Sequence, residues 1–200
     1  MIFDLIVRSM EIAGILGAET IIVHPITHGE TYCERKAVNM AFYNRLKPYC
    51  EQFGVIVAVE NMFGFADGHV TPAVCSTEAE FVDYIDSLDE RYFCACLDIG
   101  HAELRGAGAF SAVSMIRALG GKRLRALHVH DNDKTSDLHT LPFTRSIRWR
   151  EIIDALIEIG YSGVFTFEAD NFISGFPPEL SFEASKFMAT VGRYLVRDMK

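Results

Sequence analysis

Long apolar runs are missing from this chain of 200 residues. No stretch approaches the about 20 residues that a helix needs to cross a bilayer, so no membrane partner is expected. The N-terminal stretch MIFDLIVRSMEIAGILGAET has the apolar content of a signal peptide, but Asp4, Arg8 and Glu11 interrupt it. It therefore predicts an amphipathic helix, because a signal peptide requires an uninterrupted apolar segment.

Positive charge and paired cysteines are also scarce. The chain has 19 lysines and arginines against 27 aspartates and glutamates, a formal net charge of −8. This balance argues against a nonspecific nucleic-acid partner, which requires a basic surface. The five cysteines are an odd number, and no C-x-x-C pair occurs among them. These features predict a reduced, cytoplasmic chain.

What the chain does have is a regular alternation of helix and strand patterns. The apolar runs in TIIVHP, VIVAVEN, FCACLDIGH, LRALHVHDN and GVFTFEAD predict five strands that are buried on both faces. Such an alternation is typical of an open doubly wound parallel sheet or of a (β/α)8 barrel. The predicted helices span residues 3–17, 32–53, 78–88, 109–119, 149–159 and 179–197.

The C-terminal end of each predicted strand carries a side chain that can bind a metal or move a proton. These residues are His24, Glu60, Asp98, His128 and Glu168. In a barrel such strand ends meet at one rim, whereas an open sheet spreads them along a line. The pattern therefore favours an α/β fold of the (β/α)8 TIM-barrel type. Because five strands cannot close that barrel, we expect one domain over 1–200, the C-terminal five βα units of a partial barrel. The first three strands are then either missing or supplied by a partner.

Two carboxylates and a D-x-x-H motif suggest what these strand ends do. Glu60 in VAVENM and Glu168 in FTFEAD each follow apolar strand residues, and a buried carboxylate without a partner is costly. A divalent metal meets that need, and a structural salt bridge is the alternative. Two carboxylates on one metal stay ionised and also act as bases. Asp98 and His101 occur in LDIGH, where Gly100 is expected to let the backbone turn so that both side chains face one cavity.

The segment RALHVHDNDKTSDLHTLPF holds three of the seven histidines. His128 and His130 lie on the same face of the predicted strand, and only one of them needs to bind a metal. Asp137 and His139 lie two residues apart and form a second candidate ligand pair. A solvated loop rich in histidine is the alternative. His24 is either a ligand, a substrate contact or a hydrogen-bonded structural residue.

The blocks IIVHP, VAVENM, CLDIGHAEL, LHVHDND, DLHTLPF and FTFEAD, in this order, resemble the xylose isomerase-like barrel superfamily of sugar phosphate isomerases and epimerases. That group also contains DNA-repair enzymes of the endonuclease-IV type. The resemblance implies that Glu60 and Glu168 are the acid–base pair, and that His101 and Lys134 are substrate contacts. His24 is expected as a third substrate contact from its place at a strand end. It places the four metal ligands on Glu60, Asp98, His128 and Glu168.

In the endonuclease branch, the resemblance implies additional zinc ions, with ligands on His24, His101, Asp137 and His139. The chain departs from the superfamily in two respects. The first three barrel strands have no counterpart, and Arg145 and Arg148 occur in LPFTRSIRW where sugar-isomerase relatives usually carry Gly and Asp. These two additional arginines favour a phosphorylated substrate. The alternative is that they are surface residues without a role in binding.

The expected function is a divalent-metal-dependent isomerase or epimerase of a sugar or sugar phosphate, acting by proton transfer through an enediolate. The expected cofactor is one divalent ion, Mn²⁺, Mg²⁺, Co²⁺ or Zn²⁺, with no organic cofactor. The expected partner is the small-molecule sugar, and a homo-oligomer is left open. One alternative is an endonuclease-IV-like zinc phosphodiesterase acting on abasic DNA, against which the net charge argues. The other is an inactive barrel fragment.

Overall fold

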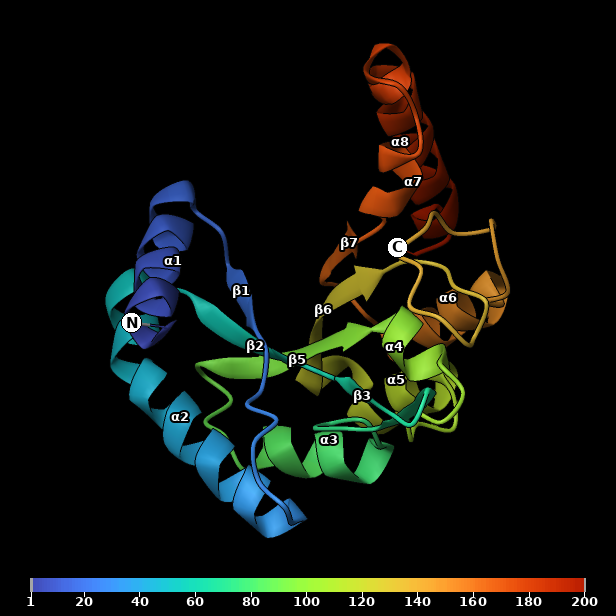
Figure 1. Ribbon diagram of the computed structural model, residues 1–200. Coiled ribbons are helices and arrows are strands. Elements are labelled where there is room, and N and C mark those ends of the chain that lie inside the picture. Colours follow the sequence, from blue (N-terminus) through green and yellow to red (C-terminus); the bar gives the residue numbers. More distant parts are fainter. Residues whose placement is uncertain (1, 200) are drawn as a thin grey trace.

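A curved sheet of five parallel strands forms the centre of the computed structural model, which describes residues 2–199 (Figure 1). The strand order is β1-β2-β5-β6-β7, so neighbouring strands follow one another along the chain apart from a short hairpin. The predicted five parallel strands of a partial barrel are thereby confirmed. The strands are β1 (Thr20–Val23), β2 (Ile56–Glu60), β5 (Phe93–Asp98), β6 (Leu124–Val129) and β7 (Val164–Phe167).

Most helices lie around the outside of the curved sheet, whereas the last long helix extends beyond the final strand (Figure 1). Local sequence explains their limits. The second helix begins after Thr31, whose hydroxyl and the carboxylate of Glu34 form a reciprocal capping box, and it ends before Gly54, whose φ is 67°. The helices are α1 (Ile2–Leu16), α2 (Tyr32–Phe53), α3 (Glu78–Asp86), α4 (Ile99–Glu103), α5 (Ala112–Arg123), α6 (Trp149–Glu158), α7 (Asp170–Ser174) and α8 (Ser181–Val196), with a 3₁₀ turn η1 (Pro178–Leu180).

The two faces of the sheet carry different side chains. The outer face packs large apolar residues such as Leu97 and Leu127 against the helices, with Trp149 of α6 also fully buried there. The inner face carries smaller side chains, including Ala58 and Cys96. The metal-capable residues at the strand ends have the parity of this inner face, so the curvature of the sheet turns them toward one another.

The expectation that all five strands are buried on both faces is wrong for the edge strands. Residues of β7 alternate between exposed and partly buried, and Val164 is 67% exposed. The reason is that β7 pairs only with β6, and β1 only with β2, among the described strands. Only the central strands are covered on both sides, and β2 and β5 are almost entirely buried.

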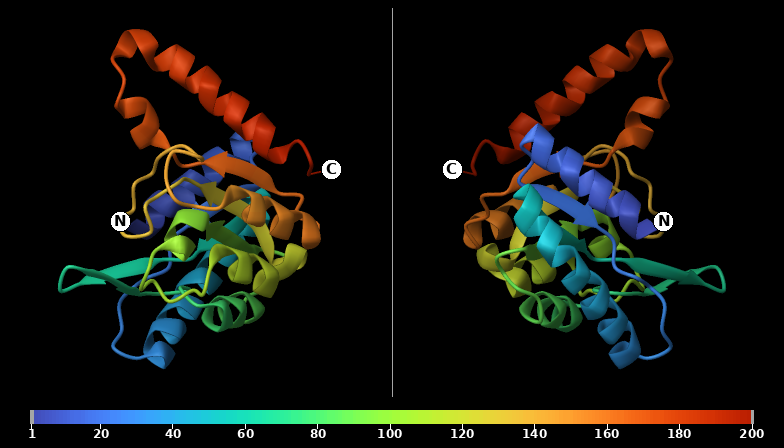
Figure 2. Two further views of the ribbon diagram at one scale, coloured as in Figure 1. Left: turned by 90° about the vertical axis from the view of Figure 1, so that its right-hand side faces the viewer. Right: turned by 90° about the vertical axis from the view of Figure 1, so that its left-hand side faces the viewer.

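The structure contains elements that the sequence pattern did not predict. A hairpin of β3 (Phe63–Ala66) and β4 (His69–Pro72) projects from the body (Figure 2), and its turn has positive φ at Asp67 and Gly68, as a two-residue hairpin requires. The helix expected over 109–119 begins later, because Ser111 caps its N-terminus. Among residues 2–199 no helix combines the length and the apolar content that a membrane span requires.

Candidate metal centre

Four strand ends gather the predicted metal ligands at the C-terminal rim of the sheet. Glu60 and Asp98 end β2 and β5, His128 is the last but one residue of β6, and Glu168 directly follows β7. Asp98 and His128 are partners in the parallel register. Each of the four side chains offers one ligand atom, and these atoms all lie within 4.8 Å of one another. The structure therefore brings the four residues together from four separate strands.

Short polar contacts join three members of this group, which we call the first ligand group. His128 Nδ1 lies 3.0 Å from Glu60 Oε1 and 2.9 Å from Glu168 Oε2. Burial would raise the pKa of Glu60, but the hydrogen bonds with His128 and His24 lower it to about 2. Burial would lower the pKa of His128, but the two carboxylates raise it to about 10. The carboxylates of Glu60 and Glu168 thus contact one imidazole whose pKa is raised, an arrangement in which a proton takes the place of a metal cation.

The donor set of the first ligand group fits a divalent metal. Asp98 is fully buried, and its Oδ1 accepts hydrogen bonds from the backbone N–H of His101 at 2.7 Å and from His130 Nε2 at 3.1 Å. Its Oδ2 is buried without a hydrogen bond to any residue among 2–199. A buried anionic oxygen without a partner is costly, and a cation bound by three carboxylates and an imidazole would satisfy it.

A second ligand group lies beside the first. Asp137 Oδ2 lies 2.9 Å from His139 Nε2 and 3.6 Å from His101 Nε2. The ring of His130 stacks on the ring of His139 with a centroid distance of 4.2 Å. The ligand atoms of this group again lie within 4.8 Å of one another. The second ligand group comprises His101, His130, Asp137 and His139.

His130 is the member of this group that sequence reasoning missed. Its Nε2 lies 3.1 Å from Asp98 Oδ1 and 3.4 Å from Asp137 Oδ1, so it connects the two ligand groups. His130 follows His128 by two residues, a spacing that puts both on one face of a continuous strand. However, β6 ends at Val129, before His130. Beyond that residue the strand parity no longer decides where a side chain lies.

Gly100 serves a purpose different from the one expected. It was expected to let the backbone turn, but it lies inside α4. A Cβ atom built at this position would lie 1.9 Å from Cε1 of His130. The glycine therefore leaves room for a buried imidazole.

The three predicted substrate contacts have different surroundings. His24 Nε2 lies 2.9 Å from Glu60 Oε2, its side chain is 62% exposed, and the hydrogen bond to Glu60 raises its pKa. His101 belongs to the second ligand group, and only 8% of its side chain is exposed. Lys134 Nζ lies 2.6 Å from Glu103 Oε2, so its charge is already paired. Of the three, His24 is the one whose side chain both faces the first ligand group and is open to solvent.

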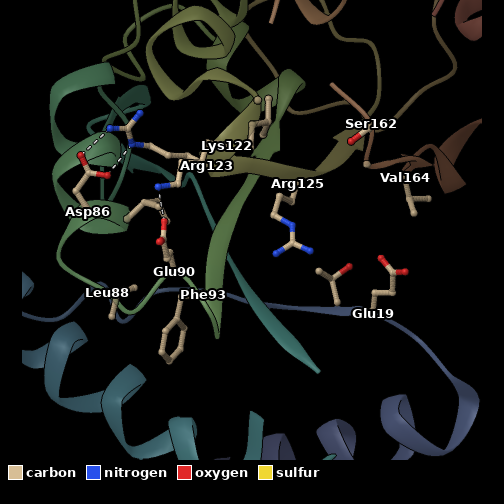
Figure 3. A pocket seen from close by; sticks show the side chains of 15 residues that line it. Glu19, Asp86, Leu88, Glu90, Phe93, Lys122, Arg123, Arg125, Ser162 and Val164 are labelled. Atoms are coloured by element: carbon tan, nitrogen blue, oxygen red, sulfur yellow. Dashed lines mark hydrogen bonds and ion pairs between the residues drawn. The ribbon is translucent and has the colours of Figure 1, made fainter. Parts of the chain in front are cut away.

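A cavity of about 630 Å³ lies at the opposite, N-terminal rim of the sheet (Figure 3). Its lining includes Phe93 and Val164, the first residues of β5 and β7. Arg123 closes one side of it through two hydrogen bonds to Asp86, of 2.7 and 2.8 Å. Barrel enzymes build their active sites at the C-terminal rim, so this cavity does not compete with the two ligand groups.

Solved structures with similar folds include a D-tagatose 3-epimerase-like protein, with a TM-score of 0.76 and 21% identity over 99% of this chain and 71% of that one. The IolI protein with a bound zinc atom has a TM-score of 0.74 and 19% identity, covering 100% of this chain and 70% of that one. At these identities the likeness shows the fold alone.

Two curated relatives are uncharacterized proteins. The protein y4fM of Sinorhizobium fredii is 26% identical over 82% of this chain and 51% of its own length. The protein MJ1311 of Methanocaldococcus jannaschii is 26% identical over 78% of this chain and 52% of its own. The chain thus spans about half the length of the curated relatives that it matches. The model of the xylose isomerase-like TIM barrel family matches residues 2–191, and the chain belongs to that family.

Proposed function

We propose that the protein is a divalent-metal-dependent isomerase or epimerase of a sugar or a sugar phosphate. The observation that carries the proposal is the first ligand group, in which two glutamates, an aspartate and a histidine meet within 4.8 Å at the C-terminal rim. Similar folds support it, because they include a D-psicose 3-epimerase solved in the presence of D-fructose and a D-tagatose 3-epimerase-like protein.

The residues that would hold the metal are Glu60, Asp98, His128 and Glu168. When bound, a divalent cation supplies Lewis-acid stabilisation of negative charge that develops on the substrate oxygens. The two glutamates carry the proton transfer. One glutamate, as the carboxylate, takes the proton from the carbon beside the carbonyl, leaving an enediolate. The other, as the carboxylic acid, gives its proton to a carbon of that enediolate, so the two exchange protonation states in each turnover. The low pKa of Glu60, about 2, keeps this carboxylate ionised.

His24 completes the proposed reaction centre. Its imidazole contacts Glu60 Oε2 at 2.9 Å while most of its side chain is open to solvent. It is therefore placed to hold that carboxylate in position and to contact a substrate oxygen with its exposed edge. Neither role requires His24 to bind the metal, and His24 belongs to neither ligand group.

Deuterium exchange tests this proposal directly. The protein is loaded with Mn²⁺ and incubated in D₂O with a panel of ketoses, aldoses and their phosphates. We expect deuterium on the carbon beside the carbonyl of at least one substrate, and no exchange after the metal is removed with a chelator. Absence of exchange on every substrate would contradict the proposal. Comparison of each sugar with its phosphate decides which class is preferred.

The second ligand group favours a second candidate, a zinc phosphodiesterase that uses more than one ion. Three imidazoles and a carboxylate form a donor set suited to zinc. The net charge of −8 argues against a DNA substrate. We expect one metal ion per chain, and an Asp137→Ala, His139→Ala double variant that retains it. Two or three zinc ions in the wild type, one fewer in the double variant and cleavage of abasic-site DNA would favour the phosphodiesterase.

A further inference from the structure

Asn61 connects the ends of β2 and β5 beneath the first ligand group. It directly follows Glu60 and is 1% exposed. Its Nδ2 donates to the carbonyl oxygen of Asp98 at 3.0 Å, and its Oδ1 accepts from the backbone N–H of Asp98 at 2.7 Å. The regular pairing of the two strands ends with Glu60 opposite Cys96. The amide of Asn61 therefore extends the link between the strands to the residue that ends β5.

The backbone of Asn61 reaches the second ligand group as well. Its carbonyl oxygen lies 2.9 Å from Nδ1 of His101. A carbonyl oxygen only accepts hydrogen bonds, so the ring donates from Nδ1 and turns Nε2 toward Asp137, at 3.6 Å. One residue thus contacts Asp98 of the first group through its side chain and His101 of the second through its main chain.

The two side-chain hydrogen bonds of Asn61 hold the backbone of Asp98 in a buried place. Asp98 is 0% exposed, and it has no freedom to move without losing these bonds. The carboxylates of Glu60 and Asp98 come from the neighbouring strands β2 and β5. Asn61 holds the C-terminal ends of those two strands together. Ligand separation and direction decide metal affinity, and partners that orient ligands typically change it by about 10–100-fold.

We propose that Asn61 is a positioning residue of the metal centre, which sets the separation of the Glu60 and Asp98 carboxylates. This role rests on the proposed function, because it presupposes that the first ligand group binds a divalent cation. It assigns Asn61 no contact with the substrate or with the metal.

The chain offers a matched control in Asn39, which is 0% exposed where Asn61 is 1% exposed. Its amide holds the backbone of Ile26 in the same way, accepting from the N–H at 2.7 Å and donating to the carbonyl oxygen at 2.8 Å. Ile26 belongs to neither ligand group. Asn39→Ala therefore removes a comparable pair of side-chain hydrogen bonds to one backbone residue, together with the bond from Asn39 Nδ2 to the Arg35 carbonyl oxygen at 2.9 Å, without releasing a proposed ligand.

The experiment measures Co²⁺ binding to the metal-free full chain, both as an affinity and as a visible absorption spectrum, with melting curves recorded without metal. We expect Asn61→Ala to lower the Co²⁺ affinity by about 10–100-fold and to alter the spectrum. Asn39→Ala should lower the melting temperature comparably and leave affinity and spectrum unchanged. If Asn61→Ala does not fold, Asn61→Gln keeps the amide but displaces it by one methylene, and it should show the same loss of affinity.

The possible failures are distinguishable. A wild type that binds Co²⁺, with a folded Asn61 variant of equal affinity and spectrum, overturns the role of Asn61 alone. Equal losses of Co²⁺ affinity in the Asn39 and Asn61 variants also overturn it, because the effect would then be general destabilisation. A wild type that binds no Co²⁺, Mn²⁺ or Zn²⁺ overturns the proposed function and this role together.

Discussion

Replacing Gly100 by alanine should disrupt the connection between the two ligand groups. The new Cβ would lie 1.9 Å from Cε1 and 2.2 Å from Nε2 of His130, whereas ordinary carbon contacts are about 3.5–4.0 Å. The imidazole must therefore move by well over an ångström. It is fully buried, stacked on His139 and hydrogen-bonded to Asp98, so it cannot move without losing these contacts.

The magnitude follows from two terms. Overpacking a close-packed interior costs about 1–3 kcal/mol, and leaving a buried polar group without its hydrogen bond costs about 1–3 kcal/mol. We expect Gly100→Ala to lower the free energy of unfolding by about 2–6 kcal/mol. For a chain of this size that corresponds to a fall in Tm of roughly 4–24 °C.

Urea unfolding of the metal-free protein measures this change. Gly175→Ala is the matched control, because a Cβ there would meet its nearest neighbours at an ordinary 3.8 Å. In a His130→Ala background the clash is absent, and Gly100→Ala should become neutral or stabilise by up to about 1 kcal/mol through its helix propensity. The reasoning would be refuted by a cost below 1 kcal/mol in the wild-type background, or by equal costs in both backgrounds.

Three further predictions concern the ligands and the thiols. Glu60→Gln and Glu168→Gln should each reduce turnover by more than the about 10²–10⁴-fold of a lost general base, because each loses a ligand as well; turnover within tenfold of wild type would contradict the assignment. His128→Ala should lower metal affinity, measured by calorimetry, far more than His130→Ala, whose loss should cost only about 10–100-fold; the reverse order would exchange their roles. Cys33 is the one exposed cysteine among residues 2–199, so a thiol reagent should modify one site per folded chain, and none after Cys33→Ser.

Much of the fold follows from local patterns in the sequence. The strands were predictable because each is a short apolar run between helical patterns, and the limits of α2 were predictable to the residue. That the polar strand ends meet at one rim also followed from the sequence, whereas the choice of four of them as metal ligands came from the resemblance to the barrel superfamily. Parallel strands end at the same rim, so polar residues at four such ends, among them Glu60 and Asp98, are brought together once the sheet curves.

Other features depended on contacts between residues far apart in the chain. His130 joins the second ligand group because it lies beyond the end of β6 and packs against α4, thirty residues earlier in the chain. Val164 is exposed because β7 is an edge strand, and an apolar run looks the same at an edge as at the centre of a sheet.

The sequence by itself determined the order of the five sheet strands and the six long helices, and the kind of side chain at each strand end, because periodicity and capping act within a few residues. Only the tertiary structure decided that Asn61 holds Asp98 and that Gly100 leaves room for His130. These contacts depend on the distance between separate segments at the rim, and no local pattern contains that distance.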